Sequence, residues 1–346
     1  MTLIEVINWS FALVPVLVLA GSFYWLDVFK LMSRGEAAGL LLLGACSAAV
    51  AYPISGVFLD TLPLGFNFYS RVVAPWIEEG LKAVAVIGLF RFNKIGLKVD
   101  ALIAGFTIGA GFSVVENIIY LLRFPDLMPS VWMVRGAGTA IMHGSTAAIL
   151  AALAHQFAER RTRAAAGDFH FNILWFVPGL LIAVAIHTLF NQFPDRPMVA
   201  MLGTLLTAPL VLIAIFRYGT KEAREWLVEE EDAHKALLAA LDAGAFPDTA
   251  GWRRIADLVA RSGEQMGSLI REYVLVLTRL VLESEETMLK QSGDTHLLLT
   301  DSGRLFLRLT ELKRELGPAT VHGLTSLLPF SRNDYWEVWE LHRHLR

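Results

Sequence analysis

The chain has a single cysteine, Cys46, which excludes a disulfide framework within one chain and a metal site built from thiolates. Charge is scarce over the first part: residues 1–220 hold 14 Lys and Arg and 12 Asp and Glu, whereas residues 221–346 hold 16 and 21. The net charge of -3 is small and indicates no nucleic-acid partner. These absences argue against a disulfide-stabilised secreted domain and against a DNA- or RNA-binding protein.

The chain is rich in apolar residues, above all where charged residues are scarce. Hydrophobic residues make up 55% of the chain and the mean hydropathy is +0.50, which is typical of a protein that crosses a bilayer several times. We predict an all-α, polytopic membrane protein with about seven transmembrane helices in residues 1–220 and a soluble helical domain in residues 221–346. The predicted spans cover residues 6–26, 37–59, 69–90, 99–122, 132–157, 171–193 and 198–217.

Lysine and arginine are distributed unevenly between the two ends of these spans, and this bias sets membrane orientation. We expect the richer side to be cytoplasmic, so that the N-terminus lies outside the plasma membrane and the C-terminal domain lies in the cytoplasm. The 11 basic residues of one side are Lys30, Arg34, Arg91, Lys94, Lys98, Arg160, Arg161, Arg163, Arg217, Lys221 and Arg224, and the four of the other are Arg71, Arg123, Arg135 and Arg196.

Residues 221–346 have helical periodicity but no recognisable site. No nucleotide-binding loop, metal-ligand spacing or catalytic motif is evident in this sequence, and its histidines, like His155 and His170, are expected at interfaces or in solvent. Docking of a cytoplasmic partner is a hypothesis from position alone. An apolar stripe at helical spacing precedes a Gly-Pro stop: Leu305, Phe306, Leu309, Leu312 and Leu316, then Gly317-Pro318.

Four predicted spans contain ionisable or amide side chains that hydrocarbon does not favour. A charge at the centre of a membrane helix costs roughly 2.5–3.5 kcal/mol on insertion scales, so such groups indicate function by default. In chain order they are Glu78, Glu79 and Lys82, then Glu116, then His143, then His187 and Asn191.

These groups are predicted to lie at one depth. The third-span glutamates, Glu116, His143 and His187 are each seven or eight residues from the outer end of their span, which is about 10–12 Å along a helix. Glu78 and Lys82 are four residues apart and are expected to pair; Asn191 follows His187 by four and could orient that imidazole or a substrate carbonyl. Glycines of the fourth span should allow close helix packing: Gly105, Gly109 and Gly111.

The residue types permit a zinc site within the membrane. Glu116, His143 and His187 could supply the three nitrogen and oxygen ligands of an open catalytic zinc ion. Such an ion lowers the pKa of a bound water toward neutrality. This set predicts hydrolysis of a peptide bond that is delivered within the membrane.

The remaining groups suit the other steps of hydrolysis. Glu78 or Glu79 could act as the general base, and Asn191 or Lys82 could stabilise the oxyanion. Ser113 and Ser145 lie near the same depth, but no serine has a plausible base beside it, which argues against nucleophilic serine catalysis.

At these positions the sequence resembles the PrsW family of intramembrane proteases, which is grouped with the Abi/CPBP proteins and the type II CAAX prenyl endopeptidases. The motifs E-E-x-x-K, F-x-x-x-E and H-x-x-x-N correspond to Glu78–Lys82, Phe112–Glu116 and His187–Asn191, with His143 between the last two. Their order matches, and each lies in a separate span. The match covers roughly residues 70–195.

The resemblance implies a protease that acts on membrane-anchored protein substrates, with an anti-sigma factor as the implied class. By similarity to the CAAX enzymes, Glu78 would activate the water, while His187 and Asn191 would hold the oxyanion. The resemblance covers none of residues 221–346.

Two other classes of protein remain open from sequence. A proton-coupled transporter would also place carboxylates, histidines and a lysine at one depth, but no internal repeat is evident. A non-catalytic membrane receptor would leave the coplanar charges without a role.

Overall fold

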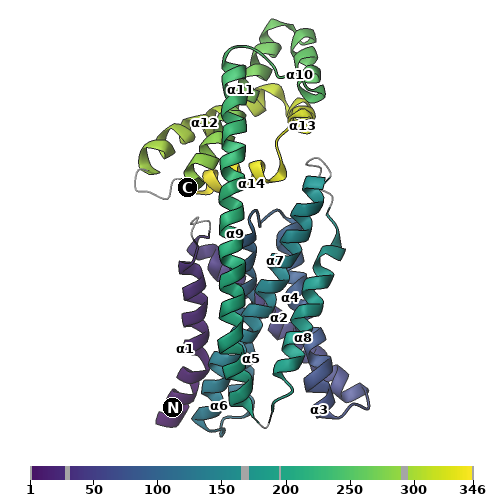
Figure 1. The fold of residues 1–346 in the computed structure, drawn as a ribbon, viewed down its shortest axis with the longest axis vertical. Coiled ribbons are helices and arrows are strands. Elements are labelled where there is room, and N and C mark those ends of the chain that lie inside the picture. The colour runs from purple at the N-terminus through teal and green to yellow at the C-terminus, as the bar shows by residue number, and fades with distance from the viewer. Residues whose placement is uncertain (1, 28–31, 165–170, 195, 290–294, 345–346) are drawn as a thin grey trace. The chain divides into compact units, whose positions relative to one another are not determined.

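The computed structural model describes residues 2–27, 32–164, 171–194, 196–289 and 295–344. Every regular element in these ranges is a helix, which confirms the all-α prediction (Figure 1). The chain divides into two units, residues 1–221 and 222–346. From the sequence we expect a transmembrane protease domain in residues 1–220 and a cytoplasmic helical domain in residues 221–346, and these assignments stay predictions.

The first unit is a bundle of long apolar helices. Two of them begin with a capping box, in which Thr2 pairs with Glu5 and Ser33 with Glu36, so the first backbone N–H groups are satisfied. The helices are α1 (Leu3–Trp25), α2 (Arg34–Thr61), α3 (Phe66–Phe68), α4 (Ala74–Arg91), α5 (Lys98–Arg123), α6 (Pro129–Val134), α7 (Ala140–Ala164), α8 (Val177–Phe190) and α9 (Pro197–Asp242).

Six helical stretches of the described chain are long and apolar enough to span a membrane. The third predicted span is not among them, although residues 66–91 are helical throughout, because α4 carries Glu78, Glu79, Lys82 and Arg91. The structure therefore confirms a multi-pass protein, and the count of seven spans stays a prediction.

Helix α5 lies at the centre of this unit, against α1, α2 and α7 (Figure 1). Its glycines permit the close approach that the sequence predicted. A Cβ atom built on Gly109 would lie 2.1 Å from the His143 carbonyl oxygen of α7, and one on Gly111 would lie 2.0 Å from the Leu41 carbonyl oxygen of α2. Only hydrogen fits at these two contacts, so α5 packs backbone to backbone with its neighbours.

The second unit is built from the end of α9 and five further helices. These are α10 (Ala250–Arg261), α11 (Gly263–Leu289), α12 (Thr295–Leu316), α13 (Pro318–Leu327) and α14 (Arg332–His344). The predicted stop at Gly317-Pro318 is confirmed: Gly317 has φ of 77° and separates α12 from α13. The apolar stripe of α12 lies in a core with Trp252, Ile270, Tyr273 and Leu277.

Some sequence predictions lie beyond what the structure describes. Lys30, on which the predicted orientation partly rests, and His170 are outside the described residues, and nothing is described of the side chains of Arg161 and Arg163. The orientation of the two termini stays a prediction.

Candidate active site within the helix bundle

The polar groups that the sequence singled out come together from four helices. Helix α4 contributes Glu78, Glu79 and Lys82, and α5 contributes Glu116. Helices α7 and α8 contribute the two histidines, His143 and His187. Residues that are up to 109 positions apart thus meet, as the prediction of a common depth required.

Glu79 and Lys82 form a buried ion pair. Lys82 Nζ lies 2.6 Å from Glu79 Oε1, and both side chains are fully shielded from solvent. The predicted pairing of Lys82 with Glu78 is therefore wrong in its partner: three residues of spacing, rather than four, turn Glu79 toward the lysine. Neutralisation within one helix lets both charges lie inside the bundle.

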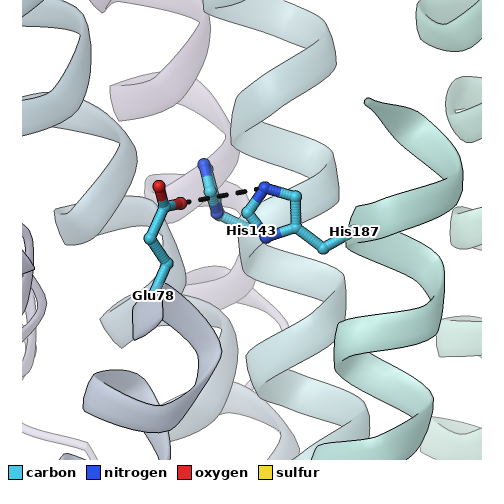
Figure 2. A group of neighbouring side chains, drawn as sticks. All are labelled: Glu78, His143 and His187. Atoms are coloured by element: carbon cyan, nitrogen blue, oxygen red, sulfur yellow. Dashed lines mark ion pairs between the residues drawn. The ribbon is translucent and has the colours of Figure 1, made fainter. Parts of the chain in front are cut away.

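His187 is held between the two adjacent glutamates of α4. Its Nδ1–H donates to Glu79 Oε1 at 2.8 Å, and its Nε2 lies 3.7 Å from Glu78 Oε2 (Figure 2). Because Nδ1 carries the proton, the lone pair of Nε2 faces a carboxylate oxygen that is buried and has no hydrogen-bond partner. Two electron-pair donors face each other here.

His143 has a partner at each ring nitrogen. Lys82 Nζ donates to Nδ1 at 3.0 Å, and Nε2–H donates to Glu116 Oε2 at 3.0 Å. Its ring lies edge-on to that of His187, with centroids 4.9 Å apart. The two imidazoles therefore belong to one contact network, although neither bonds to the other.

Glu116 is neutralised by Arg135, a residue that sequence reasoning used only as a marker of the outer membrane side. Arg135 Nη2 lies 3.1 Å from Glu116 Oε1, and its guanidinium stacks 3.7 Å from the centre of the Tyr120 ring. The sequence could have indicated this pair, because an arginine within an apolar run requires a nearby carboxylate. Arg135 begins a π-helical turn (Arg135–Thr139), and such turns often occur at functional sites.

Asn191 does not bond to the His187 imidazole, and its predicted contact with a substrate carbonyl stays a prediction. Its Nδ2 donates to the Ser70 carbonyl oxygen at 2.9 Å, in a second π-helical turn (Tyr69–Val73) just before α4. The prediction that it orients the His187 imidazole is wrong, because Glu79 occupies that position. Asn191 instead ties the end of α8 to the segment that leads into Glu78.

Two of the side chains set aside at the sequence level, Ser113 and His155, have partners outside the polar network, whereas the buried Ser145 hydroxyl has none among the described residues. Ser113 bonds to Thr139 rather than to a histidine. His155 was expected at an interface or in solvent, but it is buried and bonds to the Gly96 carbonyl oxygen. Its burial follows from the dense packing of α7, and it lies apart from the polar network.

One group within this network has the composition of a metal site. Glu78, His143 and His187 each offer a donor atom, and these atoms lie within 4.8 Å of one another (Figure 2). A carboxylate and two imidazoles are the donor set of many catalytic zinc sites. Glu116, which the sequence proposed as the carboxylate ligand, is not in this group; its carboxylate contacts His143 Nε2 and Arg135.

Comparison with known proteins gives one match. Residues 34–216 match the family model described as PrsW family intramembrane metalloprotease. The match covers more than half of the chain and includes all seven of the predicted site residues. No curated protein and no solved structure matches.

Proposed function

Since the chain belongs to the PrsW family of intramembrane metalloproteases, we propose that it cleaves membrane-anchored proteins at the Glu78–His143–His187 group. The observation that supports this placement best is the state of Glu78. Glu79 has Lys82 as its ion-pair partner and Glu116 has Arg135, whereas Glu78 Oε2 is buried, lacks a hydrogen-bond partner and faces His187 Nε2.

In this proposal Glu78 is the general base. Its carboxylate accepts a proton from the attacking water, and the hydroxide adds to the carbonyl carbon of the scissile peptide bond. The same carboxyl then gives the proton to the leaving amide nitrogen as the C–N bond breaks. Glu79 does not share this role, because it is held by Lys82 and His187; it positions His187 and fixes its tautomer.

The metal that the family description implies fits the residues present. Glu78, through one carboxylate oxygen, would hold it with His143 and His187, because unpaired acceptor atoms of Glu78 and His187 already face each other. The other oxygen of Glu78 would then accept the proton of the attacking water. For His143 to join, its bond to Lys82 or to Glu116 must open. A bound divalent ion such as zinc would supply a Lewis acid that acidifies water.

Oxyanion stabilisation is assigned to Asn191 rather than Lys82. The Lys82 ammonium is committed to Glu79 and His143, with Thr146 Oγ1 at 3.4 Å. The Asn191 amide uses one N–H for the Ser70 carbonyl and has a second N–H to offer. Donors of this kind stabilise a developing oxyanion.

The proposed substrate is a protein with a membrane anchor, of the anti-sigma-factor type that the family resemblance implies. Such a substrate would reach the site through the bilayer, which is the second partner of the chain. The described residues give no observation that favours the proton-coupled transporter left open by the sequence.

The test is cleavage of a panel of single-span substrates by the purified full-length protein. Glu78→Gln should lower kcat by about 10²- to 10⁴-fold, the usual contribution of a general base. Asp126→Asn, in the exposed turn after α5, is the matched control and should cleave at the wild-type rate. Undiminished cleavage by Glu78→Gln would place the chemistry elsewhere.

Metal content separates the two carboxylates as ligands. If Glu78 is a ligand, Glu78→Gln loses bound metal while Glu116→Gln retains it. The reverse result would restore the ligand set that the sequence predicted and leave Glu78 as base alone. His187→Ala should lower both metal content and cleavage.

A further inference from the structure

A second cluster of ionisable side chains lies in the unit of residues 222–346. His234 of α9, Glu285 of α11 and Asp334 of α14 each offer a donor atom, and these atoms lie within 4.8 Å of one another. Successive members of this group are about 50 positions apart in the chain, so no motif spacing predicted them. We call these three residues and Glu337 the tail cluster.

The tail cluster is buried to an extent that is unusual for carboxylates. Glu285 and Glu337 have no exposed surface, Asp334 is 2% exposed, and the His234 side chain is 12% exposed. Glutamate and aspartate are almost never fully buried unless they are paired. The expectation that the tail histidines lie in solvent or at interfaces does not fit His234, which belongs to this buried group.

The partners described for these carboxylates are too few to neutralise their charges or to satisfy all of their oxygen atoms. His234 Nδ1 lies 2.7 Å from Glu285 Oε1, and Asp334 caps the first turn of α14 together with Ser331. The further side-chain partner of Asp334 among the described residues is another carboxyl, that of Glu230. No lysine or arginine forms an ion pair with Glu285, Asp334 or Glu337 among the contacts of the described residues. Three buried acids thus share one imidazole.

Glu337 is a second, independent indication of a ligand site at this cluster. Both of its carboxylate oxygens are buried without a hydrogen-bond partner, and so are Glu285 Oε2 and Asp334 Oδ1. The carboxyls of Asp334, Glu285 and Glu230 all act electrostatically on Glu337, which belongs to the same buried acidic region but not to the three donors within 4.8 Å of one another. Burial raises the pKa of both the Glu285 and the Glu337 carboxyls, as expected where no cation compensates the charge.

We propose that His234, Glu285 and Asp334 bind one divalent transition-metal ion, of the Zn²⁺ or Mn²⁺ class, whose charge also compensates the neighbouring buried carboxylate of Glu337. One imidazole nitrogen with carboxylate oxygens suits these ions, whereas Mg²⁺ and Ca²⁺ prefer oxygen alone. A metal here would neutralise the buried acids and join α9, α11 and α14. The tail cluster lies beyond residue 216, where the family match ends, and does not depend on the proposed protease site.

Metal content of the full-length protein tests the proposal. The protein in detergent micelles is stripped with EDTA and then dialysed against ZnCl₂ or MnCl₂, and bound metal per chain is measured. Glu285→Gln/Glu337→Gln should carry one equivalent less than wild type, whatever the membrane group binds, because His143 and His187 are unchanged. Glu264→Gln, exposed in the first turn of α11, is the matched control and should retain the wild-type content.

Proteolysis of residues 222–346 is the second readout. An added soluble protease cuts this unit only while it is locally unfolded, and a ligand present well above its Kd reduces the unfolded population in proportion to its excess. Metal should therefore slow digestion of residues 222–346 by the added protease about 10-fold or more in wild type. The double variant should show no slowing. The proposal is overturned if wild type and double variant contain the same amount of metal and if metal does not change the rate of digestion. That result would indicate that the carboxylic acids are protonated and share hydrogen bonds instead.

A third measurement applies if the double variant does not fold. The chain His143→Ala/His187→Ala lacks both imidazoles of the membrane group and keeps the tail cluster. Titration with Co²⁺ should give visible ligand-field bands that the further change His234→Gln removes. Absence of such bands before that change overturns the proposal.

Discussion

At the scale of single residues, three membrane-embedded glutamates have three different environments. Glu79 is paired with a lysine three residues along the same helix, and Glu116 with an arginine of another helix. Glu78 is adjacent to Glu79 in sequence but has no lysine or arginine partner among the described contacts, and it faces the Nε2 rather than the Nδ1 of His187. The assignment of Glu78 as base therefore rests on its neighbours and not on its residue type.

The buried ion pair leads to a prediction about stability. Lys82→Met should destabilise the protein by roughly 3–5 kcal/mol, because it leaves the Glu79 charge buried without its ammonium partner. The free energy of unfolding in micelles, measured by denaturant titration, checks this.

The double variant Glu79→Gln/Lys82→Met is the control for that experiment. It removes both charges, so it should recover most of the lost stability. If Lys82→Met alone is as stable as wild type, the pair is not buried as described. If the double variant is no better than the single one, lost packing of the long lysine side chain is the cause.

At the scale of elements, the site depends on how closely α5 and α7 approach. Gly109 of α5 contacts the carbonyl oxygen of His143, so the helix that bears Glu116 lies directly against the helix that bears an imidazole. A glycine in an apolar helix predicts close helix packing only weakly. The contact of Gly109 with the neighbouring backbone shows that it serves this purpose here.

Gly109→Ala should destabilise the bundle by about 1–3 kcal/mol, because the new methyl group meets backbone that must shift. Cleavage should fall as well, since His143 moves with its carbonyl. Gly203→Ala is the matched control, because nothing lies within 4 Å of the added Cβ on α9. Thermal unfolding of both variants in micelles measures the difference, and equal melting temperatures would contradict the close contact.

At the scale of the whole molecule, the chain combines an apolar bundle with a more highly charged helical unit. The family match covers residues 34–216 and stops short of the second unit. The tail cluster gives that unit a candidate site of its own. Whether the two units lie on the predicted sides of the membrane depends on the lysine and arginine bias alone.

Cysteine labelling tests this orientation, because Cys46 is the only native thiol. On a Cys46→Ser background, Asp126→Cys in the turn after α5 should react with an impermeant maleimide in intact cells. Asp248→Cys, in the unit of residues 222–346, should react only after the membrane is permeabilised. The opposite pattern would reverse the predicted topology.

The sequence by itself determined the helical class, the break in composition near residue 220 and the glutamates, histidines and lysine that meet in the helix bundle. It could do so because hydrocarbon tolerates charge poorly, so each exception to the apolar pattern is informative. The motifs that resemble the PrsW family lie at the same exceptions, and the family match agrees with them.

Only the tertiary structure decided which of these groups bond to one another. Helical spacing allowed Lys82 to pair with Glu78 or Glu79, and side-chain direction chose Glu79. Arg135 pairs with Glu116, and the Ser70 carbonyl bonds to Asn191, through contacts between helices, which leave no periodicity in the chain. The tail cluster escaped sequence reasoning for the same reason, because its residues become neighbours only when α9, α11 and α14 pack.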